Sequence, residues 1–331
     1  MDQTRENKKL SVVVSVYNEE QSLDRFYGVT AEVLRDCRWD YELIFVNDGS
    51  SDRSLDILRA LSVQDEHVKV VSFSRNFGHE AAMIAGIDHA EGDGIVCMDA
   101  DLQHPPQSIP AIIDKFEEGY EVISMIRTAR EDGGLIKKIT SAGFYKVLNF
   151  VSPLKFEANA SDFFAIARPA ADVLRQEYRE RVRYLRGYVQ SLGFNKTTLE
   201  FMAAKREAGE SHYNIRKLIR FSISTICSFS DMPLKLGIYS GLAAALIGVI
   251  VMIYSLVNKL VNDVPAGYST IIVVLCFMFA ATLLIIGIIG EYIAILFAEV
   301  KERPIYIVRE VIQSGKAQTT EINKIKRGDS L

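Results

Sequence analysis

Cysteine is scarce in this chain of 331 residues. The four cysteines, Cys37, Cys97, Cys227 and Cys276, lie far apart, and none belongs to a C-x-x-C pair. That distribution excludes a disulfide-built scaffold and a cysteine-rich zinc site, and it fits a reducing compartment. An excess of positive charge is also lacking, because 38 Lys and Arg stand against 42 Asp and Glu, for a net charge of −4. We therefore expect no nucleic acid as a partner.

Two common nucleotide-binding signatures are missing as well. No G-x-G-x-x-G follows any predicted strand and no Walker A sequence occurs, which disfavours NAD binding and a P-loop. The first nine residues (MDQTRENKK) hold no apolar segment, so no signal peptide is expected there. The length suggests roughly two structural units at about 150 residues per domain.

Charge is absent from two long stretches near the C-terminus. Residues 236–257 and 270–290 contain no charged side chain. As helices they would measure about 33 and 31 Å, against a hydrocarbon core of about 30 Å. Two buried helices of a soluble protein are the alternative, but such helices rarely run this long without a charge. We expect two transmembrane helices, 236–257 and 270–297, joined by an external loop, 258–269.

Basic residues flank these stretches on their outer sides. By the positive-inside rule both flanks are cytoplasmic, which leaves 298–331 as a cytoplasmic tail. Residues 214–235 contain apolar side chains at spacings of three and four, with basic residues at the front. They are predicted to form a juxtamembrane amphipathic helix, either in the lipid headgroup region or packed on the preceding domain. The flanking basic residues are Arg216, Lys217, Arg220, Lys235, Lys301, Arg303 and Arg309.

The first 213 residues show strands alternating with helices. Short β-branched runs at 10–16, 41–46, 68–73 and 94–98 are typical of buried parallel strands. Helical stretches follow the first three of them. This alternation predicts an α/β domain.

Polar clusters follow each of these strands. They are Tyr17-Asn18-Glu19, Asn47-Asp48-Gly49, Arg75-Asn76 and Asp99-Ala100-Asp101. Ligands of open α/β sheets bind at the carboxyl ends of the strands. A binding site is therefore expected along this edge.

Asp99 and Asp101 are two residues apart at the end of a strand. In extended backbone their side chains would point to the same side, and two close carboxylates repel unless a cation lies between them. A hard divalent ion such as Mg²⁺ or Mn²⁺ takes one or two carboxylates plus substrate phosphates, and Gln103 could add an oxygen. A solvated acidic turn is the alternative for a D-x-D sequence alone.

Asp48 lies in a turn after the second strand. Its carboxylate could accept a hydrogen bond from the imide N–H of a nucleobase, with Tyr17 packed on the base. The alternative is that Asp48 and Ser50 cap the next helix.

Two groups of cations are candidates for phosphate contacts. Arg206 lies in the segment KREAGESHY, which is either a phosphate clamp or a solvated charge run. Arg127 and Arg130 follow a strand at 121–126, on the same sheet edge. His67, His79 and His89 show no metal-ligand spacing, and surface or helix positions are expected for them.

Six segments occur in a fixed order. They are VVVSVYNEE (12–20), VNDGSS (46–51), NFGHEAA (76–82), MDADLQHPP (98–106), REAGESHY (206–213) and GIIGEYIAILFAEVKERPIYIV (287–308). The set resembles the polyprenyl-phosphate glycosyltransferases, a family-2 glycosyltransferase group that includes bactoprenol glucosyltransferases and, more distantly, dolichol-phosphate mannose synthases. The resemblance runs from about residue 10 to residue 308.

The resemblance implies a GT-A fold for residues 1–213, an α/β domain with a mostly parallel central sheet. It implies inverting transfer of one hexose from a nucleotide-sugar donor to undecaprenyl or another polyprenyl phosphate. The reaction would take place on the cytoplasmic face of the bacterial plasma membrane, in a multi-pass protein with both termini in the cytoplasm. UDP-glucose and UDP-N-acetylglucosamine are the expected donors. The lipid bilayer and Mg²⁺ or Mn²⁺ are further partners, and a homo-oligomer is left open.

The resemblance also assigns roles to residues. Asp99, Asp101 and Gln103 would serve the metal and the diphosphate, and Asp48 would contact the base. The catalytic set would be Asp101, Asp162, Arg127 and Arg206. The donor-binding set would be Tyr17, Glu19, Asp48, Asp99, Ser211 and His212. Because the acceptor phosphate is already anionic near pH 7, we interpret Asp162 as a carboxylate that orients substrate rather than as a required base.

Four positions depart from the family pattern. Ser15 stands where Pro is frequent, and Asn47 where Asp is frequent. Phe164 replaces a frequent Arg and His212 a frequent Lys, which leaves the donor sugar and the strength of the phosphate clamp open.

Two other functions are considered. A processive polysaccharide synthase would need a Q-x-x-R-W segment after the D-x-D, but Trp39, the single Trp, precedes Asp99. A catalytically inactive nucleotide-sugar-binding scaffold is the non-enzymatic alternative, and absence of any sugar transfer would favour it.

Overall fold

The computed structural model describes residues 8–128, 157, 160–181, 184–202, 227, 230, 232–261, 268–314 and 316–319. The chain divides into two compact units. The first contains the N-terminal α/β part together with the residues from Pro304 onward. The second contains the two long helices. Arg130, Arg206, Ser211 and His212, for which the sequence predicts roles, lie outside the described residues, as does most of the predicted juxtamembrane helix.

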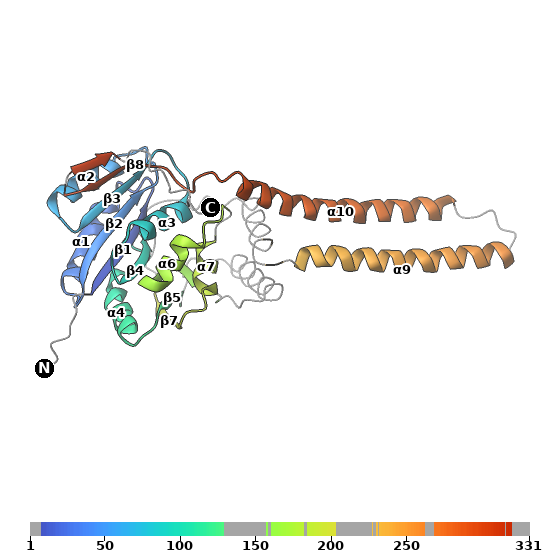
Figure 1. Cartoon of the computed structure of the whole chain (residues 1–331), viewed down its shortest axis with the longest axis horizontal. Helices are drawn as coiled ribbons and strands as arrows, with labels where there is room; N and C mark the ends of the chain where they lie inside the picture. The colour runs from blue at the N-terminus through green and yellow to red at the C-terminus, as the bar shows by residue number, and fades with distance from the viewer. Residues whose placement is uncertain are drawn as a thin grey trace, which may run out of the picture. The chain divides into compact units, whose positions relative to one another are not determined.

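A nine-stranded sheet forms the centre of the first unit (Figure 1), in the order β7-β5-β6-β4-β1-β2-β3-β8-β9. The strands are β1 (Lys9–Val16), β2 (Asp40–Asn47), β3 (Val68–Phe73), β4 (Gly94–Asp99), β5 (Val122–Arg127), β6 (Ala160–Ala167), β7 (Lys196–Phe201), β8 (Val308–Gln313) and β9 (Lys316–Thr319). Strands β4, β1, β2 and β3 pair in parallel, and β7 pairs in parallel with β5. Only β6 and β8 run against the other described strands. The expected α/β fold with a mostly parallel sheet is confirmed.

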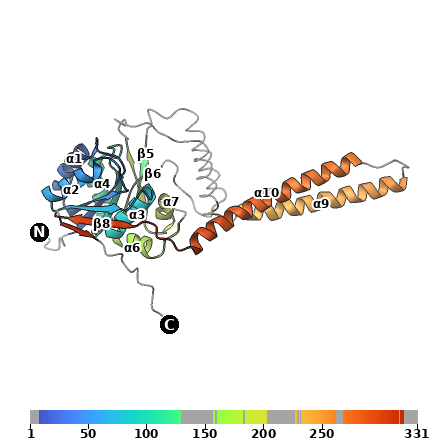
Figure 2. The same ribbon diagram turned by 90° about the horizontal axis from the view of Figure 1, so that it is seen from above.

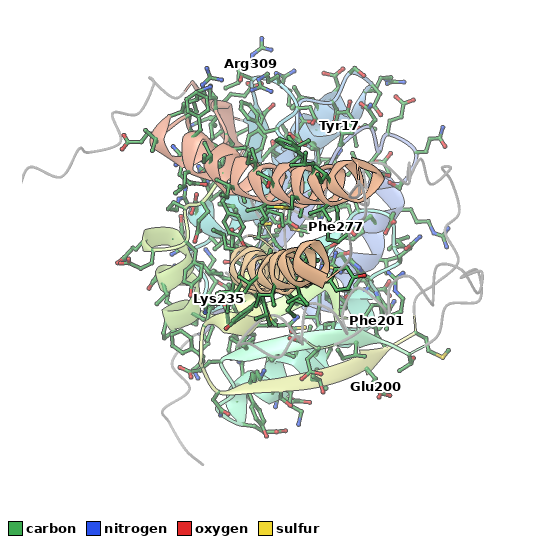
Figure 3. All side chains as sticks on the ribbon, turned by 90° about the vertical axis from the view of Figure 1, so that its right-hand side faces the viewer. Tyr17, Glu200, Phe201, Lys235, Phe277 and Arg309 are labelled. Carbon is green, nitrogen blue, oxygen red and sulfur yellow. The ribbon has the colours of Figure 1, made fainter. Side chains whose placement is uncertain are left out.

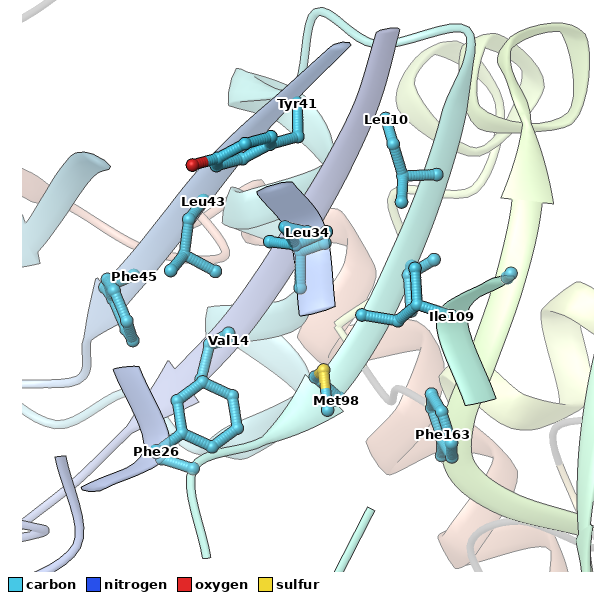
Figure 4. Packing of buried hydrophobic residues seen from close by; sticks show 14 of the residues in the cluster. Leu10, Val14, Phe26, Leu34, Tyr41, Leu43, Phe45, Met98, Ile109 and Phe163 are labelled. Carbon is cyan, nitrogen blue, oxygen red and sulfur yellow. The ribbon is translucent and has the colours of Figure 1, made fainter. Parts of the chain in front are cut away.

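The central strands are apolar on both faces because helices cover both faces. Every residue of β3 is buried, and so is every residue of β2 after Asp40. A strand covered on both sides reads as a continuous β-branched run, which is the pattern in the sequence. Figure 4 shows one side of this core, where Val14 and Met98 of the sheet meet Phe26 and Leu34.

Two layers of helices enclose the sheet (Figures 1 and 2). The first layer contains α1 (Leu23–Arg35), α2 (Ser54–Gln64) and α4 (Ile109–Glu117), with the short 3-10 helix η1 (Pro106–Ser108) before α4. The second contains α3 (His79–His89), α6 (Arg168–Gln176) and α7 (Leu185–Ser191). Helix α3 lies very close to β1, because a Cβ at Gly86 would stand 2.0 Å from Cγ1 of Val13.

Strands β8 and β9 lie within residues 298–331, which the sequence analysis predicts to be a tail. Strand β8 pairs antiparallel with β3, from Lys69 opposite Gln313 to Phe73 opposite Val308, and β9 pairs with β8. The segment is short and half-exposed, and its burial pattern is not a clean alternation. Its pairing with β3 joins residues far apart in the sequence, which no local pattern reveals.

The second unit contains α9 (Met232–Val261) and α10 (Tyr268–Val300). Within α10, Phe277–Val300 is long and apolar enough to cross a membrane, with a mean hydropathy of 2.2 and none of it buried. The apolar segment of α9 by the same measure, Gly241–Val251, is shorter. Phe277, labelled in Figure 3, is 68% exposed. One spanning helix is thus supported by length and composition, and the second remains a prediction.

Candidate functional site

The predicted polar clusters lie at the carboxyl ends of the central strands. Tyr17 follows the end of β1, Asp48 follows β2, and Asp99 is the last residue of β4. Arg127 ends β5, which points the same way, and Asp162 lies near the start of β6, which points the opposite way. All five residues therefore lie along one edge of the sheet.

The loops after β1 and β2 are tied to each other by hydrogen bonds. The N–H of Asn18 donates to Oγ of Ser50 at 3.1 Å, and the N–H of Ser51 donates to Oδ1 of Asn18 at 2.8 Å. The N–H of Glu19 donates to Oγ of Ser54 at 2.9 Å, and Asn18 has a left-handed φ of 55°. These loops form one surface, and Tyr17 is 49% exposed on it.

Glu19 has a local structural role in this surface. Its Oε2 accepts a hydrogen bond from Oγ of Ser22 at 2.8 Å, just before α1. Its predicted contact with the donor remains a prediction.

Asp48 is buried and holds the next loop. Its Oδ1 accepts the N–H of Phe77 at 2.6 Å, and its Oδ2 accepts the N–H of Gly78 at 2.9 Å. The loop after β2 approaches the loop after β3 so closely that a Cβ on Gly49 would lie 2.4 Å from the carbonyl carbon of Arg75. Asp48 thus joins the loop after β2 to the loop after β3. The N-cap residue of α2 is Arg53, without a side-chain cap hydrogen bond, and the two N–H groups that Asp48 accepts here come from the segment after β3.

Asp99 and Asp101, here called the acidic doublet, lie at a turn and not in the extended backbone that the sequence predicts. Strand β4 ends at Asp99, and Oδ1 of Asp101 accepts the N–H of Gln103 at 3.0 Å. Leu102 has a left-handed φ of 57°. The direction of Asp101 is therefore fixed by this turn and not by strand alternation.

His104 fixes this turn from within the core. The N–H of Asp99 donates to Nδ1 of His104 at 3.0 Å, and the imidazole ring stacks on Phe163 with centroids 5.1 Å apart. Burial lowers the pKa of His104, and the carboxylates of Asp99, Asp101 and Asp162 oppose this shift. A neutral ring can accept the Asp99 N–H at Nδ1. Three of the predicted carboxylates thus act on one imidazole.

His79 faces the acidic residues from the first position of α3. Its Nδ1 lies 3.1 Å from Oγ of Ser15 and 3.6 Å from Oδ1 of Asp99. Burial lowers the pKa of His79, but Asp99 and Asp162 raise it by more, so its pKa is above the ordinary value. For Asp99, burial raises the pKa, but the two histidines, Arg186 and Arg127 lower it by more. Asp99 is therefore ionised at neutral pH.

Asp162 forms an ion pair at the same edge. Its Oδ1 lies 2.7 Å from Nε of Arg186, and the two side chains are 29% and 26% exposed. Beside them, Oε2 of Glu80 accepts the N–H of Leu185 at 2.8 Å. Burial raises the pKa of Glu80, and Asp162 raises it further. Glu80 and Asp162 thus join α3, β6 and α7.

The comparisons with known proteins follow the same division of the chain. Residues 11–175 match the model of Glycosyl transferase family 2, and residues 232–296 match the GtrB C-terminal hairpin. The chain is 41% identical to the glycosyltransferase YkcC of Bacillus subtilis (strain 168), over 91% of this chain and 93% of that protein. It is 36% identical to the SfII prophage-derived bactoprenol glucosyl transferase of Shigella flexneri, over 91% of this chain and 98% of that protein.

The chain belongs to glycosyl transferase family 2. The resemblance seen in the sequence is confirmed, and the enzyme class is that of a hexosyltransferase. A solved structure of glucosyl-3-phosphoglycerate synthase from Mycobacterium tuberculosis, with Mn²⁺, UDP-glucose and phosphoglyceric acid, is also similar. It has a TM-score of 0.45 and 17% identity, over 67% of this chain and 78% of that chain.

The residues of this glycosyltransferase fit a divalent cation that is shared with a substrate. Among the described residues, no three His, Cys, Asp or Glu side chains form a group that could hold a metal ion alone. Asp99 and Asp101 offer the hard oxygen donors that Mg²⁺ or Mn²⁺ prefers, and Mg²⁺ commonly completes its shell with phosphates and water. The lowered pKa of Asp99 keeps one of these donors charged.

Sequence reasoning missed four residues of this edge: His79, Glu80, His104 and Arg186. His79 was expected at a surface or helix position, and it does lie on a helix, but at the end that faces Asp99. Its place just after the polar residues that follow β3 was a usable signal. Arg186 carried no signal, because the ion pair with Asp162 depends on how α7 packs on β6.

Proposed function

We propose that this glycosyltransferase moves one hexose from a UDP-sugar to a polyprenyl phosphate at the cytoplasmic face of the bacterial plasma membrane. The observation that carries the proposal is the acidic turn at the end of β4, where the carboxylate oxygens of Asp99 lie 3.6 Å from Nδ1 of His79 and 3.6 Å from Nδ1 of His104. The names of the bactoprenol glucosyl transferase relatives support a lipid carrier and a hexose. Undecaprenyl phosphate is the acceptor that we expect, and UDP-glucose or UDP-N-acetylglucosamine the donor.

The donor is proposed to lie over the loops after β1, β2 and β3. Tyr17 would pack on the base, and Asp48 would accept an N–H from it while holding the Phe77–Gly78 backbone. Ser211 and His212 are proposed to complete donor binding. The diphosphate then points toward the acidic turn.

The chemistry requires little proton transfer. An oxygen of the acceptor phosphate forms a bond to the anomeric carbon, and the bond from that carbon to the diphosphate breaks, with its electron pair going to the diphosphate. The attacking phosphate is already ionised near pH 7, so Asp162 need not act as a base. Attack opposite the leaving group gives inversion.

Charge is the main obstacle to this transfer. Asp99, Asp101 and Gln103 would hold a Mg²⁺ or Mn²⁺ ion, which supplies Lewis-acid stabilisation of the departing diphosphate. Arg206 would add positive charge there, and Arg127 would reduce repulsion between the two anions.

The membrane topology is part of the proposal. Helices α9 and α10 would both span, with the loop between them outside and the sugar-transferring domain in the cytoplasm. Phe277–Val300 supports one span by length and composition. The match of residues 232–296 to the GtrB C-terminal hairpin covers both helices.

The test is transfer to lipid. Membranes containing the full chain are incubated with undecaprenyl phosphate and a panel of labelled nucleotide-sugars, and lipids are extracted. We expect one labelled lipid species, formed with UDP-glucose or UDP-N-acetylglucosamine and lost with EDTA. Failure to label lipid with any sugar would overturn the proposal in favour of a binding scaffold, and a ladder of polymeric products would favour a processive synthase.

A further inference from the structure

The sheet topology separates the two sides of the acidic turn. Strands β1, β2 and β3 lie on one side of β4, and β6, β5 and β7 lie on the other. The proposed donor loops follow β1, β2 and β3. Arg127 and Asp162 belong to β5 and β6. If the base lies over the first half of the edge, a second substrate must approach Asp99 from the β6 side.

Arg186 is a second cation in this half of the edge, in addition to Arg127 at the end of β5. It lies in the first turn of α7, and its Nε is 2.7 Å from Oδ1 of Asp162. The adjacent Leu185 N–H is held by Glu80 at 2.8 Å. The guanidinium also lies 5.7 Å from the ring centroid of the buried Tyr184. The position of Arg186 is thus determined from three sides.

The positive charge of Arg186 also acts on three titratable groups at this edge, those of Asp99, Glu80 and His79. Its charge lowers the pKa values of Asp99 and Glu80. It also opposes the raised pKa of His79. The geometry places Arg186 beside Asp162, on the β6 side of the edge that ends at Asp99.

An incoming phosphate monoester needs such a cation. Three aspartates, Asp99, Asp101 and Asp162, lie along this edge, and each ionised carboxylate repels a second anion. A guanidinium presents N–H donors in a planar fork that matches phosphate oxygens, and it stays charged at all relevant pH values. A phosphate dianion also attracts it more strongly than a single carboxylate does.

We propose that Arg186 binds the phosphate monoester of the acceptor, and that Asp162 is the positioning residue that holds the guanidinium for it. This proposal rests on the proposed function and adds to it the residue that recognises the acceptor headgroup. Asp162 then acts through Arg186 and not on the sugar.

The experiment measures steady-state kinetics of the full chain in detergent. Undecaprenyl phosphate is varied at saturating UDP-sugar, and then UDP-sugar at saturating lipid. We expect Arg186→Gln to raise the KM for the lipid about tenfold or more, the range for losing hydrogen bonds to a charged group. Arg186→Lys should raise it less, because charge remains without the fork. The KM for the UDP-sugar should stay within about twofold of wild type, the error of such comparisons.

Asp162→Asn tests the positioning role. On its own it should raise the KM for the lipid, and in an Arg186→Gln background it should add nothing, because its partner is gone. Full additivity of the two changes would show that Asp162 acts on its own and would overturn that part of the proposal. Arg38→Gln is the matched control, because it removes an exposed ion pair with Asp114 at the other end of the sheet.

A direct binding measurement distinguishes the proposed role of Arg186 from the proposed function of the enzyme. Binding of undecaprenyl phosphate and of the phosphate-free alcohol is compared without donor, for wild type and Arg186→Lys, with melting temperatures as a folding check. We expect the phosphate-dependent part of the affinity to fall in the variant. If wild type transfers sugar to lipid but the variants leave the lipid KM and binding unchanged, or raise only the UDP-sugar KM, Arg186 does not recognise the acceptor. If wild type transfers no sugar to lipid, the proposed function itself fails.

Discussion

Single carboxylates at the carboxyl edge are oriented by specific partners. Asp48 accepts two backbone N–H groups, Asp101 accepts the N–H of Gln103, and Asp162 pairs with Arg186. Such contacts fix the acidic groups before any substrate arrives. A preorganised site of this kind avoids the cost of reorienting charges during the reaction.

Asp101 is the first residue to test. We expect Asp101→Asn to lower the rate of sugar transfer by at least about a hundredfold, because a proposed metal ligand is replaced by a neutral group. The measurement is labelled lipid formed at saturating substrates. Asp36→Asn, at an exposed carboxylate just after α1, is the control with wild-type activity. Near wild-type transfer by Asp101→Asn would contradict the assignment.

Gly49 tests the close approach of the two loops. Its φ is +66°, and an added Cβ would lie 2.4 Å from the backbone of Arg75. We expect Gly49→Ala to lower the free energy of unfolding by about 1–3 kcal/mol and to weaken UDP-sugar binding. Gly28→Ala lies in α1 with open space around the added methyl, and it should raise stability by about 0.5–1 kcal/mol. Denaturant unfolding measures the stability of both variants. Equal changes in the free energy of unfolding would contradict the prediction for Gly49.

At the scale of elements, an ion network joins the amino ends of the strands, opposite the site. Glu42 of β2 accepts the N–H of Glu91 and a hydrogen bond from Ser11 of β1, and it lies 3.3 Å from Nζ of Lys69 of β3. Burial raises the pKa of Glu42, but these hydrogen bonds and Lys69 lower it by more. The network therefore stabilises the fold at neutral pH, and its contribution is lost as the pH falls through the lowered pKa of Glu42.

Lys69→Met tests this network. We expect it to lower the free energy of unfolding by about 1.5–3 kcal/mol at pH 7, because Glu42 loses its buried cation and keeps the partly exposed Lys9, whose Nζ lies 3.4 Å from its carboxylate. The pKa of Glu42 should then rise, so acid unfolding should begin at a higher pH than in wild type. Lys115→Met removes a surface pair with Glu118 and a cation–π contact with Tyr120, and it should change the stability by less than about 1 kcal/mol. Unfolding curves between pH 3 and 8 provide the check, and a Lys69 variant as stable as the Lys115 variant would contradict the prediction.

At the scale of the whole chain, the residues from Pro304 onward belong to the α/β unit. Tyr306 donates its O–H to Oδ2 of Asp88 at 2.5 Å, and its ring stacks on Phe73 with centroids 5.1 Å apart. Asp88 also accepts two hydrogen bonds from Arg179. Phe73 in turn contacts Phe77, whose N–H Asp48 holds. The segment after the proposed second span is thus connected to the donor loops through a few aromatic rings.

Tyr306 tests this connection. We expect Tyr306→Phe to lower the free energy of unfolding by about 1 kcal/mol, since it removes one hydrogen bond and keeps the stack. Tyr306→Ala should cost more, about 2–3 kcal/mol, because it also removes the half-buried ring and its stack on Phe73. Thermal unfolding with limited proteolysis of the 304–319 segment distinguishes the two. Equal losses for both variants would mean that the ring contributes nothing.

The sequence by itself determined the α/β fold and the sheet edge at which Asp48, Asp99 and the other candidate site residues lie, because buried strands and strand-end polar residues leave local patterns. It did not determine how the acidic doublet is oriented, since a left-handed Leu102 and the buried His104 replace the assumed strand alternation. The ion pair of Asp162 with Arg186, the approach of His79 to Asp99, and the return of residues 308–319 into the sheet join segments far apart in sequence. Such contacts depend on how elements pack against one another, and only the tertiary structure decides them.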